Sequence, residues 1–137
     1  MEVLVREYRE SDYDSVNKII IDSWSDSKSK ISCDYCHEFV SEINGEIVGY
    51  FYLLEAPDII RNLNVYYIHY FCVDTSHRGM GIGRVMVDFI EKYAKKNGVK
   101  RLELTSKNER VIAHKLYLSF GFEKRDTSVF RKEIIWY

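Results

Sequence analysis

The pattern of apolar and polar positions divides the 137-residue chain into strands and helices that follow one another closely. Residues 3–8 alternate apolar and charged side chains, as a half-buried strand does. Ser11 or Asp12 can then cap a helix, because a short polar side chain accepts from the free N–H groups of a first helical turn. The apolar side chains of that helix recur at helical spacing at Tyr13, Val16, Ile19, Ile20 and Trp24. The amino-terminal part of the chain is therefore predicted to be a strand followed by a helix.

A hairpin is predicted around Asn44-Gly45. Both residue types tolerate positive φ, so this pair is the strongest short signal for a two-residue turn between strands. The flanking runs, residues 39–43 and 46–54, have strand composition. After Pro57, residues 65–73 form a nine-residue run of β-branched and aromatic side chains, which is typical of a central strand.

The carboxyl-terminal half is predicted to contain two further helices. Residues 84–96 carry one apolar stripe and end at Asn97-Gly98, a common helix stop. Residues 101–105 alternate as a strand, and Asn108 can cap a second helix that Gly121 ends. One side of this second helix carries Ile112, Ala113, Leu116, Tyr117 and Phe120. Residues 122–124 and 128–136 are interpreted as a final antiparallel pair, which gives a single domain over residues 1–137 of the α/β (α+β) class.

Charge and cysteine content limit the partners and the compartment. The 20 basic and 21 acidic residues nearly cancel, so no global field attracts nucleic acid or an anionic membrane. No apolar stretch approaches the roughly 20 residues that cross a bilayer, and the acidic start does not resemble a signal peptide. Three cysteines are an odd number, which argues against a disulfide framework. We expect a cytoplasmic protein.

The candidate chemistry centres on the segment Arg78-Gly79-Met80-Gly81-Ile82-Gly83, which lies between the strand at 65–73 and the helix at 84–96. The free N–H groups and the dipole of a helix start attract an anion, and phosphate is the usual one. Glycine lets the backbone approach phosphate oxygens and adopt positive φ. Arg78 and Arg84 flank the turn and can add charge-assisted bonds.

Two common phosphate-binding motifs do not match these residues. A dinucleotide-binding turn needs a further glycine where this chain has Arg84 or Met86. A P-loop ends in Gly-Lys-Ser/Thr, whereas this turn ends in Gly83-Arg84-Val85.

The remaining pattern, Arg78-x-x-Gly81-x-Gly83 between strand and helix, resembles the signature of the Gcn5-related N-acetyltransferase (GNAT) superfamily. Asn108, Ala113, Leu116-Tyr117 and Gly121-Phe122 resemble its second motif, and the two together cover roughly residues 65–123. The resemblance implies a central mixed, mostly antiparallel sheet flanked by helices. It also implies acetyl-CoA as co-substrate, with no metal.

The resemblance further implies a role for each matching residue. Residues Phe71, Cys72 and Val73 would pair with the pantetheine arm, and one of their amides would polarise the thioester carbonyl. The turn Arg78, Gly79, Met80, Gly81, Ile82, Gly83 and Arg84 would hold the pyrophosphate, with Asn108 and Ala113 near the cofactor arm. Tyr117 would protonate the departing sulfur.

The general base is left open among His69, Tyr67 and water. Family members often place a Glu on this strand, and residues 65–73 contain none. By the two-residue period of a strand, we expect Tyr67, His69, Phe71 and Val73 on one face and Tyr66, Ile68, Tyr70 and Cys72 on the other. His69 is the first candidate, because an imidazole with a pKa of roughly 6.5 accepts protons near neutral pH.

The segment Cys33-Asp34-Tyr35-Cys36-His37 matches the letters of a haem-attachment motif and could begin a zinc site. Haem attachment of that kind belongs to exported proteins, and a structural zinc wants four ligands. Only Cys72 is left as a further thiol, within the predicted central strand. We therefore expect two ordinary thiols.

The main functional hypothesis is transfer of acetyl from acetyl-CoA to a primary amine of a small molecule or a protein. The alternatives are a non-catalytic CoA-binding sensor or assembly subunit, and a metal or redox module at Cys33 and Cys36. The amine is not encoded in a recognisable motif, and a homodimer is left open. The loop at 23–30, the Pro57 crossing and the final hairpin are expected to select the acceptor.

Overall fold

The computed structural model describes residues 2–136 in two compact units, residues 1–107 and 108–137, each described here by itself. The first unit contains all strands of the described chain: β1 (Leu4–Glu7), β2 (Cys36–Ile43), β3 (Glu46–Glu55), β4 (Val65–Val73) and β5 (Arg101–Glu103). Its helices are α1 (Tyr13–Trp24), α2 (Ile82–Lys96) and the short η1 (Glu10–Asp12) and η2 (Thr75–His77). The second unit holds α3 (Val111–Ser119).

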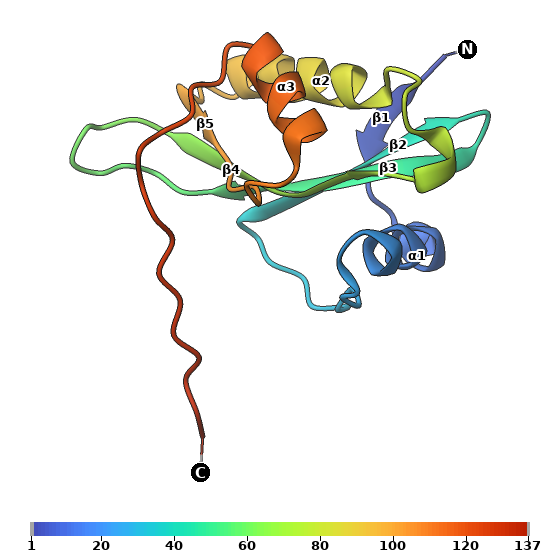
Figure 1. Cartoon of the computed structure of the whole chain (residues 1–137), viewed down its shortest axis with the longest axis horizontal. Coiled ribbons are helices and arrows are strands. Elements are labelled where there is room, and N and C mark those ends of the chain that lie inside the picture. The colour runs from blue at the N-terminus through green and yellow to red at the C-terminus, as the bar shows by residue number, and fades with distance from the viewer. Residues whose placement is uncertain (1, 137) are drawn as a thin grey trace. The chain divides into compact units, whose positions relative to one another are not determined.

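The strands form one sheet in the order β1-β2-β3-β4-β5. The first three pairings are antiparallel, and only β4 and β5 run parallel. Helix α2 covers one face of this sheet and α1 covers the other (Figure 1). The predicted mixed, mostly antiparallel sheet flanked by helices is confirmed, as are the strands at 39–43, 46–54 and 65–73.

The hairpin between β2 and β3 turns at the predicted residues. Asn44 has φ 50° and Gly45 has φ 82°, and Ile43 pairs with Glu46 across the turn. Both residues lie in the left-handed region that a two-residue hairpin turn requires.

The α2 face of the sheet is closed by tightly packed apolar side chains. Phe39 stacks on Phe51 at 5.3 Å between ring centroids and meets Phe89 of α2 edge-on at 5.1 Å. Gly49 allows α2 to lie this close, because a Cβ there would come within 2.9 Å of Met86 Sδ of α2 and would also clash with Ser41 Oγ. A larger residue at position 49 would therefore push α2 and the adjacent strands away from β3.

The α1 face is held by apolar packing and by one buried ion pair. Val16, Ile19 and Ile20 of α1 pack against the sheet on this face. Two nitrogens of Arg6 each donate to one carboxylate oxygen of Asp12, both at 2.9 Å, and Asp12 is 6% exposed. The hydrogen bond from Arg6 is the main reason that the pKa of Asp12 lies below its ordinary value.

A bulge in β4 overturns the predicted division of its side chains between the two faces. Tyr52 pairs with His69 and Tyr50 with Cys72, so two residues of β4 lie opposite the single residue Phe51. Tyr70 takes up the extra length with φ 50°. The bulge shifts the alternation by one position, so that Cys72 returns to the α1 face with His69.

The predicted face is therefore wrong for four residues of β4. Phe71 lies 6.2 Å from Phe51, ring to ring, and Val73 pairs with Gly49, so both belong to the α2 face. Cys72 lies in the α1-face cluster, and the Tyr70 ring stacks on Tyr52 of that same face. Side chains alternate between the two faces only where each residue of a strand has one partner on the next strand. At the bulge, Tyr70 and Phe71 share the single position of Phe51.

The second unit departs from two predictions. The N-cap of α3 is Arg110 and not Asn108, which lies in a turn before the helix. Within the described chain no strand follows α3, so the predicted pair at residues 122–124 and 128–136 is wrong (Figure 1). The apolar residues there are widely exposed, Phe130 by 94%, and a two-stranded pair with no third layer is marginal in water.

No helix in residues 2–136 combines the length and the apolar character needed to cross a membrane.

Candidate functional site

The glycine turn stands between the end of β4 and the start of α2, as the sequence predicted. Gly79 and Gly81 both have φ 80°, in the left-handed region where residues with a Cβ are disfavoured. Gly81 is the N-cap of α2, and nothing lies within 4 Å of the place where its Cβ would be. The space beside the turn is therefore open, and the glycines are required by backbone conformation.

The start of α2 directs main-chain amides into that space. Val85 donates the first bond of the helix, to the Gly81 carbonyl at 3.3 Å. The N–H groups of Ile82 and Gly83 have no hydrogen-bond acceptor within the helix, as in any first helical turn. Together with the positive end of the helix dipole they form a site for an anion.

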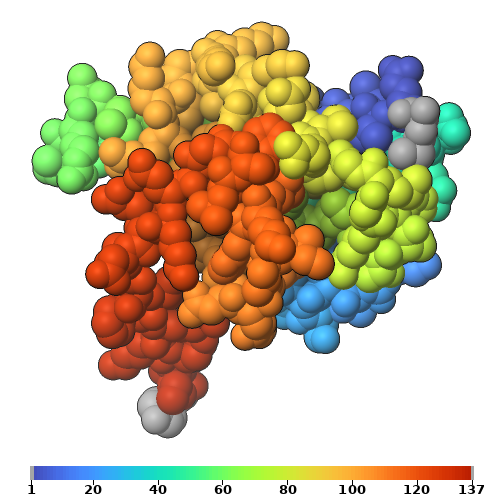
Figure 2. All heavy atoms as spheres, turned by 45° about the horizontal axis from the view of Figure 1, so that its top comes forward, coloured from blue at the N-terminus to red at the C-terminus, as the bar shows by residue number. Residues whose placement is uncertain are grey.

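Arg78, Met80 and Arg84 are exposed around the turn. Arg78 Nε lies 3.4 Å from the carbonyl oxygen of Val73, the last residue of β4. Figure 2 shows the segment from η2 through the turn, in yellow-green, at the surface of the first unit.

The turn is tied to β4 by a polar cluster in η2. Asp74 Oδ2 accepts from Ser76 Oγ at 2.5 Å and lies 2.7 Å from His77 Nδ1. These contacts, from Ser76 first and then His77, lower the pKa of Asp74 below its ordinary value. The main-chain N–H of Asp74 donates to Val48 of β3 at 2.8 Å. This cluster fixes the direction in which the chain leaves the sheet toward the glycines.

The carboxyl half of β4 has an edge that β5 does not use. The two strands pair only from Val65 with Arg101 to Tyr67 with Glu103, and β5 ends there. From Ile68 to Val73, β4 is paired with β3 on its other side.

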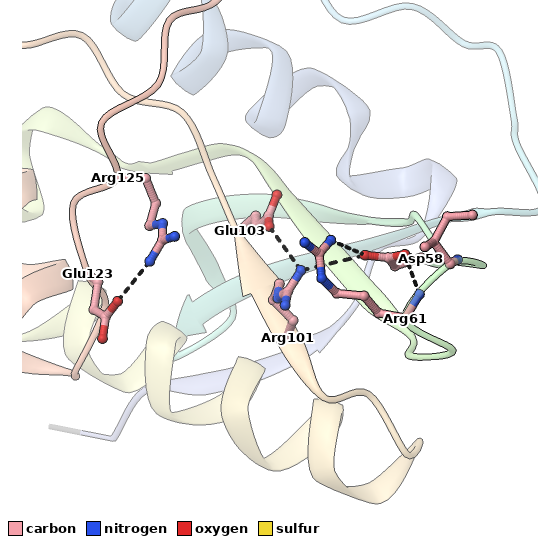
Figure 3. A network of polar contacts seen from close by, with 7 residues as sticks. Asp58, Arg61, Arg101, Glu103, Glu123 and Arg125 are labelled. Carbon is pink, nitrogen blue, oxygen red and sulfur yellow. Dashed lines mark hydrogen bonds and ion pairs between the residues drawn. The ribbon is translucent and has the colours of Figure 1, made fainter.

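An ion-pair network lies where the amino-terminal part of β4 pairs with β5 (Figure 3). Asp58, in the loop before β4, accepts from Arg61 Nη1 at 3.1 Å and lies 3.8 Å from Arg101 Nη1. Arg101 Nη1 also lies 3.9 Å from Glu103 Oε1. Burial of the Tyr67 ring raises the pKa of its phenol, and the negative charge of Glu103, to which the phenol donates, raises it further.

The site thus consists of β4, a turn with two left-handed glycines and a helix start beside open space. The Acetyltransferase (GNAT) family model matches residues 2–122. The chain belongs to the GNAT acetyltransferase family.

Curated relatives support this membership. The chain is 30% identical over 105 residues to human N-acetyltransferase 8B, covering 76% of this chain and 46% of that protein. It is 37% identical over 90 residues to an uncharacterized N-acetyltransferase of Methanocaldococcus jannaschii, covering 64% and 39%. The chain thus matches less than half the length of each of these two relatives.

The fold also recurs in solved structures. A transcriptional regulator from Bacillus halodurans superposes with a TM-score of 0.84 at 20% identity, covering 97% of this chain and all of that one. At this identity the likeness describes the GNAT fold and not a shared activity.

On β4 of this GNAT protein, the two candidate bases are in different environments. His69 is half-buried, and its ring stacks on Tyr52 at 4.8 Å and on Tyr67 at 5.7 Å. Its ring nitrogens make no hydrogen bond to any side chain or main chain of the described residues. Burial lowers its pKa below the ordinary value of about 6.5, so the ring is neutral at neutral pH. Tyr67 has a raised pKa and stays protonated under the same conditions.

The remaining predicted site residues lie in the second unit. Asn108 is in the turn before α3, and Ala113 and Tyr117 are half-buried on the helix. Tyr117 packs against Phe122, with ring centroids 5.8 Å apart, and its carbonyl accepts from the Phe122 N–H at 3.1 Å. Their roles at the cofactor stay predictions.

Cys33 and Cys36 occupy a turn that leads into β2, with the Cys36 N–H donating to the Cys33 carbonyl at 3.1 Å. Burial, followed by the neighbouring Cys33, raises the pKa of Cys36 to about 11, which disfavours the thiolate that metals bind. Across residues 2–136, no group of three or more His, Cys, Asp or Glu side chains is arranged to hold a metal ion.

Sequence reasoning missed the aromatic residues that surround His69. Trp24 of α1, Tyr52 of β3 and Tyr70 of β4 are far apart in sequence and meet on one face of the sheet. Helical and strand spacing predict which elements carry them, but the bulge that turns Tyr70 toward Trp24 has no signal in the residue pattern.

Proposed function

We propose that the protein transfers the acetyl group of acetyl-CoA to a primary amine. The observation that carries the proposal is the glycine turn between β4 and α2, where Gly79 and Gly81 both have φ 80° and the first amides of α2 adjoin open space. The pyrophosphate would accept from the amides of the turn, and the pantetheine arm would lie beside Phe71, Cys72 and Val73. Arg78 and Arg84 would add positive charge at its rim.

The chemistry proceeds by direct attack. The neutral amine nitrogen attacks the thioester carbonyl carbon, a C–N bond forms and the C–S bond breaks. A main-chain N–H within residues 71–73 would stabilise the negative charge on the carbonyl oxygen, as preorganised donors do in acyl transfer. The phenol of Tyr117 would give its proton to the departing sulfur.

His69 is the base that the surroundings of β4 favour. Its imidazole is neutral at neutral pH, and neither ring nitrogen is engaged by another residue of the described chain. Tyr67 is less suited, because a phenol with a raised pKa holds its own proton. The amine proton would pass to His69 directly or through one water.

The experiment is a measurement of thiol release from acetyl-CoA across a panel of primary amines, followed by the pH dependence of kcat/KM. With His69 as base, the acidic limb lies below about pH 6.5, because its pKa is lowered, and His69→Ala removes that limb. His114→Ala, a histidine of α3, is the control and should keep it. If the acidic limb of the pH profile is unchanged in His69→Ala, water and not His69 accepts the amine proton. If the protein binds CoA but acetylates no amine, it is a CoA-binding module and not an enzyme.

A further inference from the structure

Five aromatic side chains, His69 among them, form a row on the α1 face of the sheet, called here the aromatic row: Trp24, Tyr52, Tyr67, His69 and Tyr70. Tyr67 stacks on His69 and His69 on Tyr52. Tyr52 stacks on Tyr70 at 6.3 Å, and Trp24 meets the Tyr70 ring edge-on at 4.9 Å. The row thus runs from the candidate base to the last residue of α1.

The far end of the row depends on an unfavourable backbone conformation. Tyr70 has φ 50°, which is rare for an aromatic residue and needs strong support from its surroundings. Contacts with Trp24 and Tyr52 contribute to that support, as does Asp26, whose Oδ2 accepts from the Tyr70 hydroxyl at 3.1 Å. The result is that the rings of Tyr70 and His69, adjacent in sequence, lie on the same face.

This end of the row has a negative potential from two independent sources. Helix α1 ends at Trp24, so its last carbonyl groups and the negative end of its dipole lie beside the rings. Asp26 adds a full negative charge two residues later, on an exposed position.

The nearby cations of the same loop are held elsewhere. Lys28 Nζ pairs with Glu38 at 2.7 Å and sits over the Tyr8 ring, and Lys30 sits over the Tyr13 ring. Asp22 adds a further exposed negative charge on the last turn of α1.

We propose that the acceptor is a small aliphatic diamine or polyamine, bound with one ammonium group against Asp26 and the rings of Trp24 and Tyr70. This inference rests on the proposed acetyl transfer and names its substrate class. Aromatic faces and a carboxylate both attract an ammonium ion, and methylene groups cover ring surface well. The second amine of the same molecule would lie along the row toward His69, where it loses its proton and attacks.

The test compares 1,4-diaminobutane with butylamine, which has the same carbon chain and one amine. For the wild-type protein we expect kcat/KM for the diamine to be about tenfold higher, because only the diamine carries the second charge. Asp26→Asn should remove most of this preference, lowering the ratio of the two kcat/KM values by about tenfold. Asp14→Asn changes the same charge at the other end of α1, on an exposed residue, and should keep the ratio.

The outcomes separate this inference from the proposed function. Equal use of the two amines, or an unchanged ratio in Asp26→Asn, would overturn the diamine site and leave acetyl transfer intact. A lysine-containing peptide used better than the diamine would also overturn it. Should no amine be acetylated, calorimetric titration of 1,4-diaminobutane into the wild type and Asp26→Asn tests the site alone. Binding that the substitution weakens supports it, and absence of binding refutes it.

Discussion

The two faces of the sheet differ in where their phenylalanines lie. Where α2 covers the sheet, four phenylalanines pack ring on ring, and Tyr93 of α2 packs beside them: Phe39, Phe51, Phe71 and Phe89. On the α1 face the rings belong to tyrosine, tryptophan and histidine, and the tyrosine hydroxyls reach carboxylates, Tyr50 to Glu38 at 2.6 Å and Tyr70 to Asp26. A ring without a polar atom can be sealed in a core, whereas a hydroxyl requires a partner or water.

The comparison indicates how the two substrates would be recognised. The donor would be held mainly by the main-chain amides of the glycine turn. A substitution there would act by changing the backbone conformation. The acceptor would be selected by side chains on the α1 face. We therefore expect substitutions to act in different ways on the two sides.

The largest effect is expected from the buried ion pair on the α1 side. Asp12→Ala leaves Arg6 without its bidentate partner and should lower the free energy of unfolding by about 3 kcal/mol. Chemical denaturation measures this, with Asp14→Ala, an exposed residue on the same helix, as the control. A loss as small as that of the control would mean that the pair contributes little.

The same pair predicts the direction of acid sensitivity. The pKa of Asp12 is lower in the folded protein than in the unfolded chain, so its contribution is complete above about pH 4 and is lost as the pH falls through the folded-state value. Asp12→Ala should therefore be less sensitive to acid than the wild type between about pH 4 and pH 2.

The next effect concerns the proposed proton donor. Tyr117→Phe removes the phenolic proton and should lower kcat about 100-fold, with little change in CoA affinity. Steady-state kinetics and a CoA titration measure the two quantities. Tyr35→Phe, at an exposed tyrosine, is the control, and unchanged turnover in Tyr117→Phe would exclude it as the acid.

A smaller effect is expected at the glycine turn. Gly81→Ala places a Cβ on a residue with φ 80° and should weaken CoA binding by about tenfold, because the amides of the turn move. Gly98→Ala has the same strain, at φ 70° beyond the far end of α2, and should affect stability alone. Equal CoA affinity in the two variants would contradict a role of the turn in holding the cofactor.

The last prediction concerns the reactivity of the two cysteines at the start of β2. At pH 8, iodoacetamide should modify exposed Cys33 at least about ten times faster than Cys36, whose raised pKa of about 11 leaves little thiolate. Mass spectrometry of peptides from a time course measures both rates. Comparable rates would mean that Cys36 is more accessible than its buried surface indicates.

Local patterns in the sequence were sufficient for most elements of the first unit. Asn44-Gly45, the spacing of α1 and the glycines before α2 each depend on conformational preferences of a few neighbouring residues. The final hairpin was predicted from alternation alone, and it failed because a strand also needs a sheet to pair with. Asn108 was expected to cap α3 from its residue type, but the helix begins two residues later, after Arg110.

The sequence by itself determined the order of elements and the motif that marks this chain as a GNAT protein, because both are written in short stretches of chain. Only the tertiary structure decided which aromatic residues surround His69. A single extra residue in β4 moves Tyr70 and Cys72 to the α1 face and Phe71 and Val73 to the other, and that bulge arises from pairing with β3. The glycine turn therefore follows from local conformation, whereas the aromatic row on the α1 face follows from contacts between segments distant in the chain.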